Sequence, residues 1–316
     1  MGCGVLISII QILAPVVLII AIGWGLLRVG FLSSLALGDI NRLTYWVGLP
    51  ALLIERISGA TPALGSVGSM LVVLVGGGVA CIGAAAVIAW LWGMPARSSV
   101  TFVHGAFRGN LTFVGLPVVI YAFAGSPDAA AVESAALVAF VPLVVLYNVT
   151  AVVLMQLPGG WQPVATLKRV GQGLLTNPIL LATLAGMALA LLNWELPLLA
   201  DRTLSALGQM ALPLALLGIG GGLYTTRLRG RQHWAVTAAV LKTSVGPVVG
   251  ALLGIWVGLN AEEMRLALIF LACPTAAASF VLVQQMDGDS ALIASTIMLS
   301  HLLALPAMLL VLALTA

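Results

Sequence analysis

Residues 108–125 read RGNLTFVGLPVVIYAFAG, and this stretch decides how the whole chain is interpreted. It is mostly apolar, yet it contains an arginine, an asparagine, glycines and a proline. Proline removes a backbone donor, and in lipid each orphaned backbone group costs several kcal/mol unless protein or water satisfies it. If the stretch crosses a membrane, its interrupted backbone must therefore face protein or a watery site.

Composition places the chain in a membrane. Hydrophobic residues make up 61% of the 316 positions and charged residues only 7%, with a mean hydropathy of +1.17. A soluble protein needs far more charge to cover its surface. The net charge of +3 is explained by basic residues in loops, which set the orientation of the chain in the membrane. We therefore expect no nucleic-acid partner. The fold class predicted is an all-α polytopic membrane protein in a lipid bilayer.

Apolar stretches of about 20 residues, the length that spans a hydrocarbon core, recur along the chain. The ten predicted spans are 5–27, 39–57, 66–92, 98–124, 130–156, 175–193, 201–224, 233–258, 263–285 and 290–314. With both termini external, the inner loops hold Arg28, Arg42, Arg97, Lys168, Arg169, Arg227, Arg229 and Arg231, against Arg56, Arg202 and Arg265 outside. The positive-inside rule favours this orientation.

The two halves of the chain share landmarks at one offset. Pro15 matches Pro178, Gly23 matches Gly186 and Pro50 matches Pro213, each pair 163 positions apart. We therefore predict a five-helix repeat over 1–156, a cytoplasmic linker over 157–174, and a second five-helix repeat over 175–316. Because each half has an odd number of spans, the second repeat is inverted, which is typical of secondary transporters with a binding site near the bilayer midplane.

Spans four and nine carry the predicted site. Pro117 and Pro274 are each expected to open the second half of a broken helix, with positive helix ends that favour a carboxylate. The candidate substrate-binding residues are Arg108, Asn110, Thr112, Gly115, Pro117, Asn148, Lys242, Pro274, Thr275 and Ser279. Arg108 and Lys242 are predicted intramembrane cations, although Lys242 alternatively snorkels to the inner surface. If ions bind there instead, the candidate ligands are Asn110, Thr275, Ser279 and Gln284.

Several kinds of chemistry are not favoured. The three cysteines and three histidines are scattered, so neither a metal site nor a cofactor is expected. A membrane-embedded enzyme is disfavoured, because no acidic pair lies in mid-span. Asp289 is interpreted as the cap of the last helix.

The segments GNLTFVGLP and CPTAAASFVLVQQMDGDSALIASTIMLSHLLALP resemble the fourth, ninth and tenth spans of the auxin efflux carrier family. LAPVVLIIAIGWGLLRVGFLSS, INRLTYWVGLPALL and TNPILLATLAGMAL are similar to other parts of it. The resemblance implies two inverted five-helix repeats, with spans three to five and eight to ten forming a core. Its crossover positions are Asn110, Gly115, Pro117 and Pro274.

The resemblance also implies a scaffold of spans one, two, six and seven with a homodimer contact, and transport by elevator-like movement. The short linker at 157–174 is similar to that of bacterial members, which include malonate and malate permeases. We therefore expect a bacterial inner-membrane permease for a small carboxylate. The alternative is a sodium-coupled symporter of the related bile-acid type, and transport direction and coupling stay open.

Overall fold

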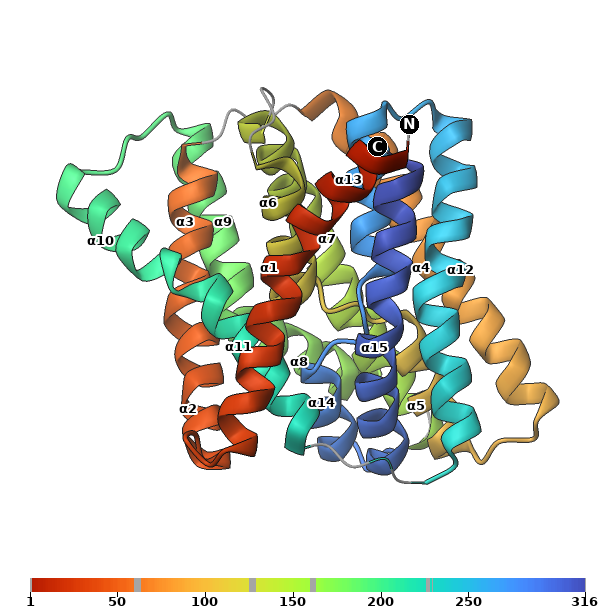
Figure 1. The fold of residues 1–316 in the computed structure, drawn as a ribbon. Helices are drawn as coiled ribbons and strands as arrows, with labels where there is room; N and C mark the ends of the chain where they lie inside the picture. Colours follow the sequence, from red (N-terminus) through yellow and green to blue (C-terminus); the bar gives the residue numbers. More distant parts are fainter. Residues whose placement is uncertain are drawn as a thin grey trace. The chain divides into compact units, whose positions relative to one another are not determined.

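The computed structural model describes residues 2–59, 64–124, 129–159, 163–225, 228 and 230–315, and within these ranges the chain is helical apart from its connections (Figure 1). Arg227 and Arg229 of the predicted inner loops lie outside the described residues. The helices of the first half are α1 Gly2–Arg28, α2 Ser34–Leu43, η1 Thr44–Gly48, α3 Leu49–Ser58, α4 Leu64–Leu91, α5 Ala96–Phe107, η2 Leu111–Gly115, α6 Leu116–Phe123 and α7 Ala129–Gln156.

The second half continues the same pattern of long and interrupted helices. Its elements are η3 Leu157–Gly159, α8 Pro163–Leu175, α9 Pro178–Leu191, α10 Leu198–Gln209, α11 Ala211–Thr225, α12 Gln232–Val257, α13 Ala261–Ala272, α14 Ala278–Gln285 and α15 Ser290–Leu314. Local capping fixes several ends. Asn177 accepts from the first turn of α9, Asn260 and Glu263 form a capping box on α13, and Asp289 caps α15 as predicted.

The all-helical class is confirmed, and each predicted span coincides with one helix or with a run of interrupted helices. Four described helical segments are long and apolar enough to cross a membrane, namely Gly68–Leu91, Gln232–Val257, Ser290–Leu314 and the segment Leu198–Thr225, which α10 and α11 form together. A bent pair, Thr166–Leu175 with Pro178–Leu191, makes a fifth if it is one span. Breaks divide other predicted spans into helices shorter than the 20 or so residues that crossing requires.

The chain forms two compact units. Unit 1 comprises Met1–Val67, Thr112–Val144 and Leu174–Thr225, and unit 2 comprises Gly68–Leu111, Val145–Gly173 and Thr226–Ala316. The boundary after Leu111 falls within the predicted span 98–124, so residues of that span are shared between the two units.

Glycines bring two helix pairs of unit 1 into backbone contact. α1 packs along α11 (Figure 1), where a Cβ on Gly23 would strike the backbone of Leu217. α3 packs along α9, where a Cβ on Gly186 would lie 2.9 Å from Cβ of Ile57 and 3.2 Å from the carbonyl oxygen of Leu53. Small residues allow such close approach of helices in membranes. Both glycines belong to the matched landmarks of the sequence.

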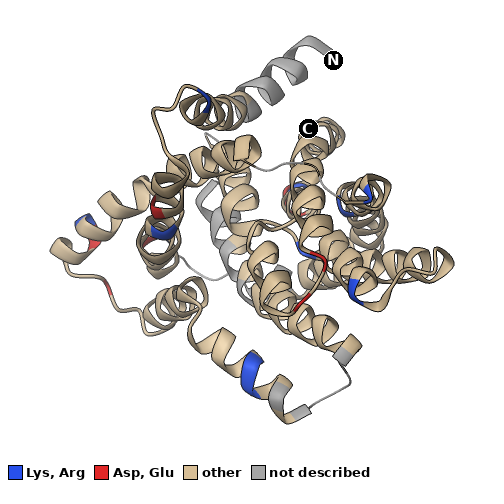
Figure 2. Ribbon diagram, turned by 90° about the horizontal axis from the view of Figure 1, so that it is seen from below, with Lys and Arg blue, Asp and Glu red and all other residues tan. Residues whose placement is uncertain are grey.

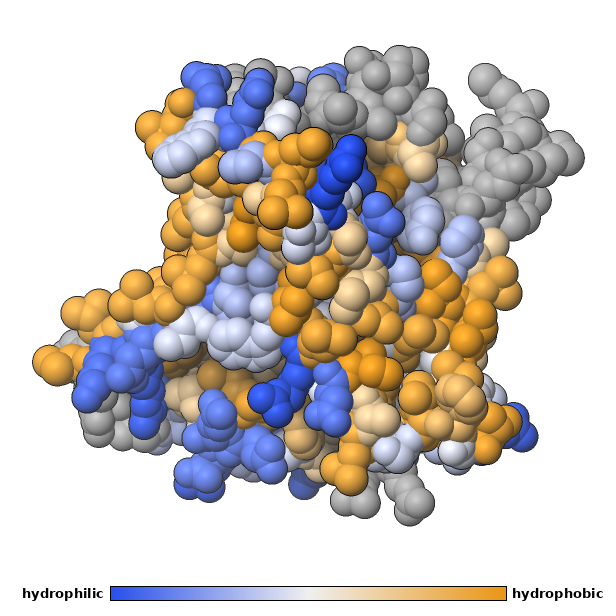
Figure 3. All heavy atoms as spheres, turned by 90° about the vertical axis from the view of Figure 1, so that its left-hand side faces the viewer, coloured by the Kyte–Doolittle hydropathy of each residue, from blue (hydrophilic) through white to orange (hydrophobic). Residues whose placement is uncertain are grey.

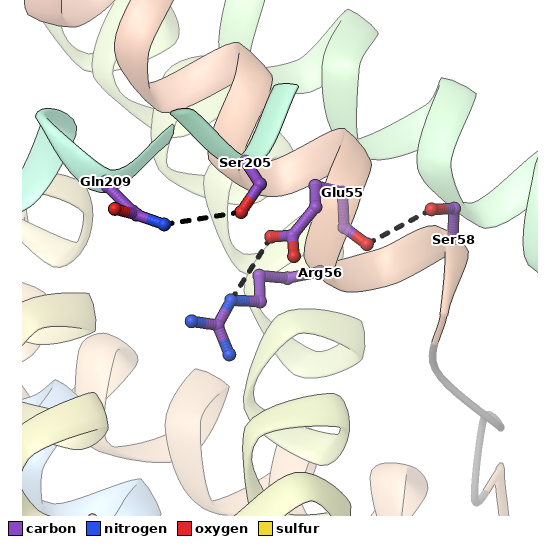
Figure 4. A network of polar contacts seen from close by, with 5 residues as sticks. All are labelled: Glu55, Arg56, Ser58, Ser205 and Gln209. Carbon is purple, nitrogen blue, oxygen red and sulfur yellow. Dashed lines mark hydrogen bonds and ion pairs between the residues drawn. The ribbon is translucent and has the colours of Figure 1, made fainter. Parts of the chain in front are cut away.

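Prolines interrupt the second helical run of each half in unit 1. Pro50 lies in the first turn of α3, and the π-helical turn η1 directly precedes that helix. Proline has no N–H to continue the α-helical hydrogen-bond ladder, so the regular pattern is interrupted here. Likewise α10 ends at Gln209, just before α11 and Pro213. The polar contacts drawn in Figure 4 are local: Arg56 pairs with Glu55 at 3.3 Å, and Gln209 contacts Ser205.

Unit 2 is organised around α12, which packs against α5, α13 and α15. Its apolar core draws Ala85, Phe102, Ala238 and Leu292 from α4, α5, α12 and α15. Charged residues are few along the whole ribbon (Figure 2), and exposed hydrophobic side chains cover much of the face drawn in Figure 3. Such a surface suits lipid contact.

The α1–α11 contact yields a stability prediction. A methyl at Gly220 would meet the carbonyl oxygen of Ile20 and lie 2.8 Å from the amide nitrogen of Trp24, whereas one at Gly222 meets nothing within 4 Å. Overpacking of this kind costs about 1–3 kcal/mol. Gly220→Ala should therefore lower the melting temperature in detergent by about 5 °C relative to Gly222→Ala. Equal melting temperatures for the two variants would contradict the close contact.

Candidate functional site

Two helices of unit 2 break at the same place. α5 ends at Phe107 and α13 ends at Ala272, and the chain after each is extended. The two extended segments pair in antiparallel fashion at Gly109 and Thr275. The amide of Asn110 donates to the carbonyl of Pro274 at 2.7 Å, and that of Ala276 donates to the carbonyl of Arg108 at 2.9 Å. We call the paired segments 108–110 and 274–276 the inter-break bridge.

Pro117 opens the α-helix α6 in the second half of its span, as predicted, whereas the prediction that Pro274 opens a second half-helix is wrong. Pro117 lies in the first turn of α6, which follows η2 directly, and the break comes earlier, at 108–110. Pro274 lies inside the other break, four residues before α14 begins. Its ring forces Cys273 into an extended conformation (φ −53°, ψ 142°), so this proline ends α13.

The backbone of the second break explains why α13 stops. Pro274 has no N–H, and the amide of Thr275 donates to Oγ of Ser300 at 2.9 Å. The amide of Ala276 is committed to the bridge. The carbonyls of Leu271 and Ala272, which these two amides would cap in a continuous helix, therefore lose their usual partners.

A lysine replaces one of those partners. Nζ of Lys242, on α12, donates to the carbonyl oxygen of Leu271 at 2.6 Å. The side chain is only 1% exposed, so it does not snorkel to the surface. A Cβ on Gly109 would lie 3.4 Å from Cε and 3.5 Å from Nζ of Lys242, which places the ammonium beside the inter-break bridge.

The end of α5 is capped from across the bridge. Oγ1 of Thr275 donates to the carbonyl oxygen of Gly105 at 2.8 Å. The equivalent helix end in the other break is capped by the Lys242 ammonium. The two helix C-termini that meet here are thus stabilised by chemically different groups, one neutral and one cationic.

A second cation lies on the bridge itself. Arg108 is half-buried, and its guanidinium donates to Oδ1 of Asn148 on α7 at 2.8 Å. No Asp or Glu is among the buried side chains of the described residues. The interior of unit 2 around the bridge therefore carries positive charge, with amide and carbonyl oxygens around it.

The structure distributes the remaining predicted residues unevenly. Asn110, Thr275 and Ser279 are buried in unit 2, and Oγ of Ser279 has no hydrogen-bond partner among the described residues. Gln284 is exposed and lies about 7 Å from Ser279 along the axis of α14. Three other candidates belong to unit 1, on η2 and α6: Thr112, Gly115 and Pro117.

Sequence reasoning did not select two buried groups of unit 2. Both ring nitrogens of His104 have no partner among the described residues, and the ring stacks edge-on against Phe107. Ser300 supports the bridge through the amide of Thr275. The available signal was a polar residue within an apolar span, which alone does not distinguish a site from ordinary helix contacts.

A polar cavity of about 280 Å³ lies elsewhere in unit 2, between α5, α7, α8 and the α14–α15 connection. Its polar lining includes Arg97, Gln156, Arg169, Gln285 and Asp287. None of these residues is among the binding candidates predicted from the sequence. Arg97 and Arg169 are instead predicted to lie in the inner loops that set the orientation in the membrane. In the described part of the chain, no group of His, Cys, Asp and Glu could hold a metal ion.

These features define a helical, multi-pass membrane protein whose broken helices pair through their backbones. The sequence profile of a family described as membrane transport protein matches residues 8–312. The chain belongs to this family, which confirms the resemblance to the auxin efflux carriers. No protein of curated function matches the chain in sequence.

The hydroxyl of Ser300 offers a test of the bridge. Ser300→Ala leaves the buried amide of Thr275 without its acceptor, which should cost about 1–3 kcal/mol. Ser244→Ala is the matched control, because that exposed hydroxyl donates only to a carbonyl within its own helix. Thermal unfolding in detergent should separate the two variants, and equal stability would contradict the role of Ser300.

Proposed function

We propose that this membrane transport protein is a permease for a small organic anion, a mono- or dicarboxylate, bound at the inter-break bridge. The observation that carries the proposal is the charge of the site. Lys242 and Arg108 lie beside and on the bridge, and no buried acid is present among the described residues. At an effective dielectric constant near 20, a carboxylate about 4 Å from one such cation gains about 4 kcal/mol.

Neutral groups near the bridge suit the same ligand. The unpartnered hydroxyl of Ser279 lies in the first turn of α14, at the positive end of that helix dipole. Asn110, Asn148 and Thr275 supply amide and hydroxyl groups that orient a carboxylate. Thr112, Gly115 and Pro117 complete the predicted set from the following segment. Their participation is part of the proposal.

We further propose ten transmembrane helices in two inverted five-helix repeats, over 1–156 and 175–316 and joined by the linker 157–174. Unit 1 supports this organisation. The first helix of one half contacts the second helical run of the other half through Gly23, and the reciprocal pair does so through Gly186. Exchanging the two halves converts one contact into the other, as a repeat requires.

Transport is proposed to proceed by elevator-like movement, with a core of spans three to five and eight to ten carrying the anion. The scaffold of spans one, two, six and seven would form a homodimer. The positive-inside rule favours external termini and cytoplasmic basic loops, in a bacterial inner membrane. These features rest on the family and on charge distribution.

Two alternatives are less well supported. A sodium-coupled symporter would use Asn110, Thr275, Ser279 and Gln284 as ligands, but an ammonium already contacts the carbonyl end of α13. A membrane-embedded enzyme would need clustered acids or an activated nucleophile, and the family is one of transporters.

The first test removes the charge on the bridge. Arg108→Gln should weaken carboxylate uptake into proteoliposomes at least about tenfold, equivalent to roughly 1.4 kcal/mol, because the guanidinium contributes to anion binding. Arg202→Gln, at an exposed position of α10, is the control and should transport normally. Uptake that is unchanged in Arg108→Gln would refute the role of the guanidinium.

The second test keeps the arginine and neutralises its field. Asn148→Asp places a carboxylate where Oδ1 now accepts from Arg108 at 2.8 Å. The resulting ion pair should compete with the substrate and reduce affinity more than Asn148→Ala, which leaves the guanidinium charge in place. Apparent KM for uptake measures the difference. A larger loss in Asn148→Ala would indicate a structural role for the amide.

A further inference from the structure

The polar cavity of unit 2 lies at the other end of α5 from the inter-break bridge. Arg97 is in the first turn of α5, ten residues before Phe107, which places it about 15 Å from that residue along the helix axis. Gln285, the last residue of α14, also lines the cavity. None of the residues proposed to bind the transported anion lines it. The cavity is therefore separate from the bridge.

Two arginines from different helices give the cavity its charge. Arg97 comes from α5 and Arg169 from α8, and both side chains are exposed. Asp287 lines the same cavity, yet within the described residues neither arginine forms an ion pair with it or with another acid. Two guanidinium groups and one carboxylate leave a net positive charge. The N-terminus of α5 adds to it, because Pro95 provides no side-chain cap for the positive end of that helix dipole.

A buried amide at the wall of the cavity lacks a partner for its nitrogen. Gln156, the last residue of α7, lines the cavity and is 8% exposed. Its Oε1 accepts from the hydroxyl of Thr166 on α8, whereas its Nε2 has no hydrogen-bond partner in the part of the chain that the structure describes. A buried donor without an acceptor is costly, and an anion in the cavity would supply the acceptor.

We propose that this cavity binds a phosphate group, held by Arg97 and Arg169 with the amide of Gln156 as a further donor. Guanidinium groups form paired, charge-assisted hydrogen bonds with phosphate oxygens. The tetrahedral oxygens of phosphate accept from several directions at once, which suits donors that come from three helices. The volume of about 280 Å³ is just below the roughly 300–1,000 Å³ of ordinary ligand pockets, so the group that enters is small.

A phosphate group reaches this cavity from one of two sources, the head group of an anionic phospholipid or a free phosphate compound. Both present the same oxygens to the arginines. The lipid source is supported by α8, which exposes Val164 and Leu167 beside its basic residues Lys168 and Arg169. Amphipathic helices of this composition lie at the surface of anionic membranes.

The first experiment uses inorganic phosphate and the purified full-length protein in detergent. Phosphate should raise the melting temperature of the wild type by about 3 °C, because a ligand that binds only the folded state stabilises it. Arg97→Gln and Arg169→Gln should lose at least half of this shift. Lys168→Gln is the matched control, since this exposed lysine precedes Arg169 on α8 but does not line the cavity. It should keep the full shift, as any general effect of phosphate salts would be common to all variants.

Asp287→Asn tests the charge with the opposite sign. Asp287 has a φ of 52°, a conformation that asparagine also adopts readily, so the change removes a carboxylate from the lining without straining the backbone. Affinity for inorganic phosphate, measured by titration of the melting temperature, should rise severalfold. Asp39→Asn, at an exposed acid of α2, should bind like the wild type. Unchanged or weaker binding by Asp287→Asn would contradict an anion site.

Malonate distinguishes this cavity from the proposed substrate site. At the same concentration, malonate should give a shift that Arg108→Gln reduces and Arg169→Gln does not. A malonate shift that is lost in Arg169→Gln would refute the assignment of the cavity to phosphate. If malonate stabilises no variant, the proposed substrate class loses support, whereas the result with phosphate stands.

Reconstitution into nanodiscs separates the two sources of phosphate. The discs contain phosphatidylcholine with or without added phosphatidylglycerol. If a lipid head group is the ligand, phosphatidylglycerol should raise the melting temperature of the wild type and Lys168→Gln more than that of Arg169→Gln. If a free compound is the ligand, inorganic phosphate should do so and the added lipid should not. Either result supports the site, and the absence of an arginine-dependent shift with both phosphate and lipid overturns the inference.

Discussion

The antiparallel pairing of residues 108–110 with 274–276 is the constraint on which the site depends. Two helices cannot stop inside an apolar protein without new partners for their backbone groups. The bridge supplies two of them, through the amides of Asn110 and Ala276. Ser300 and Thr275 supply two more, from the next helix and from the bridge itself. The breaks are therefore mutually supporting, because each is satisfied by residues of the other.

The bridge also determines where charge is needed. The amides of Thr275 and Ala276 donate to Ser300 and to the bridge, so they do not pair with the carbonyl end of α13. The ammonium of Lys242 donates to that end instead. Gly109 has no side chain, which lets the lysine lie against the extended segment. The positive charge beside this break follows from the need to pair a backbone carbonyl that has lost its helical partner. The same charge makes the region suitable for an anion.

Local patterns in the sequence were sufficient for the helices and the family. Long apolar runs place the spans within a few residues, and the predicted cap Asp289 marks the start of α15. The position of the first break was not predictable in this way. Pro117 is the obvious breaker, yet the helix stops earlier, at Phe107, because Gly109 pairs with Thr275, which is 166 residues further along the chain. Lys242 was recognised as an intramembrane cation, but its carbonyl partner depends on the fold.

The two halves of the proposed repeat correspond closely in unit 1 and less closely at the inter-break bridge. Gly23 and Gly186 make reciprocal helix contacts in unit 1, as expected where both halves serve the same packing role. At the bridge the two helix ends differ, with the hydroxyl of Thr275 on one and the ammonium of Lys242 on the other. Packing alone gives no reason for this difference, since a neutral donor is sufficient for the first end. The anion site that we propose does give one, because an asymmetric ligand needs its charge balanced on one side only.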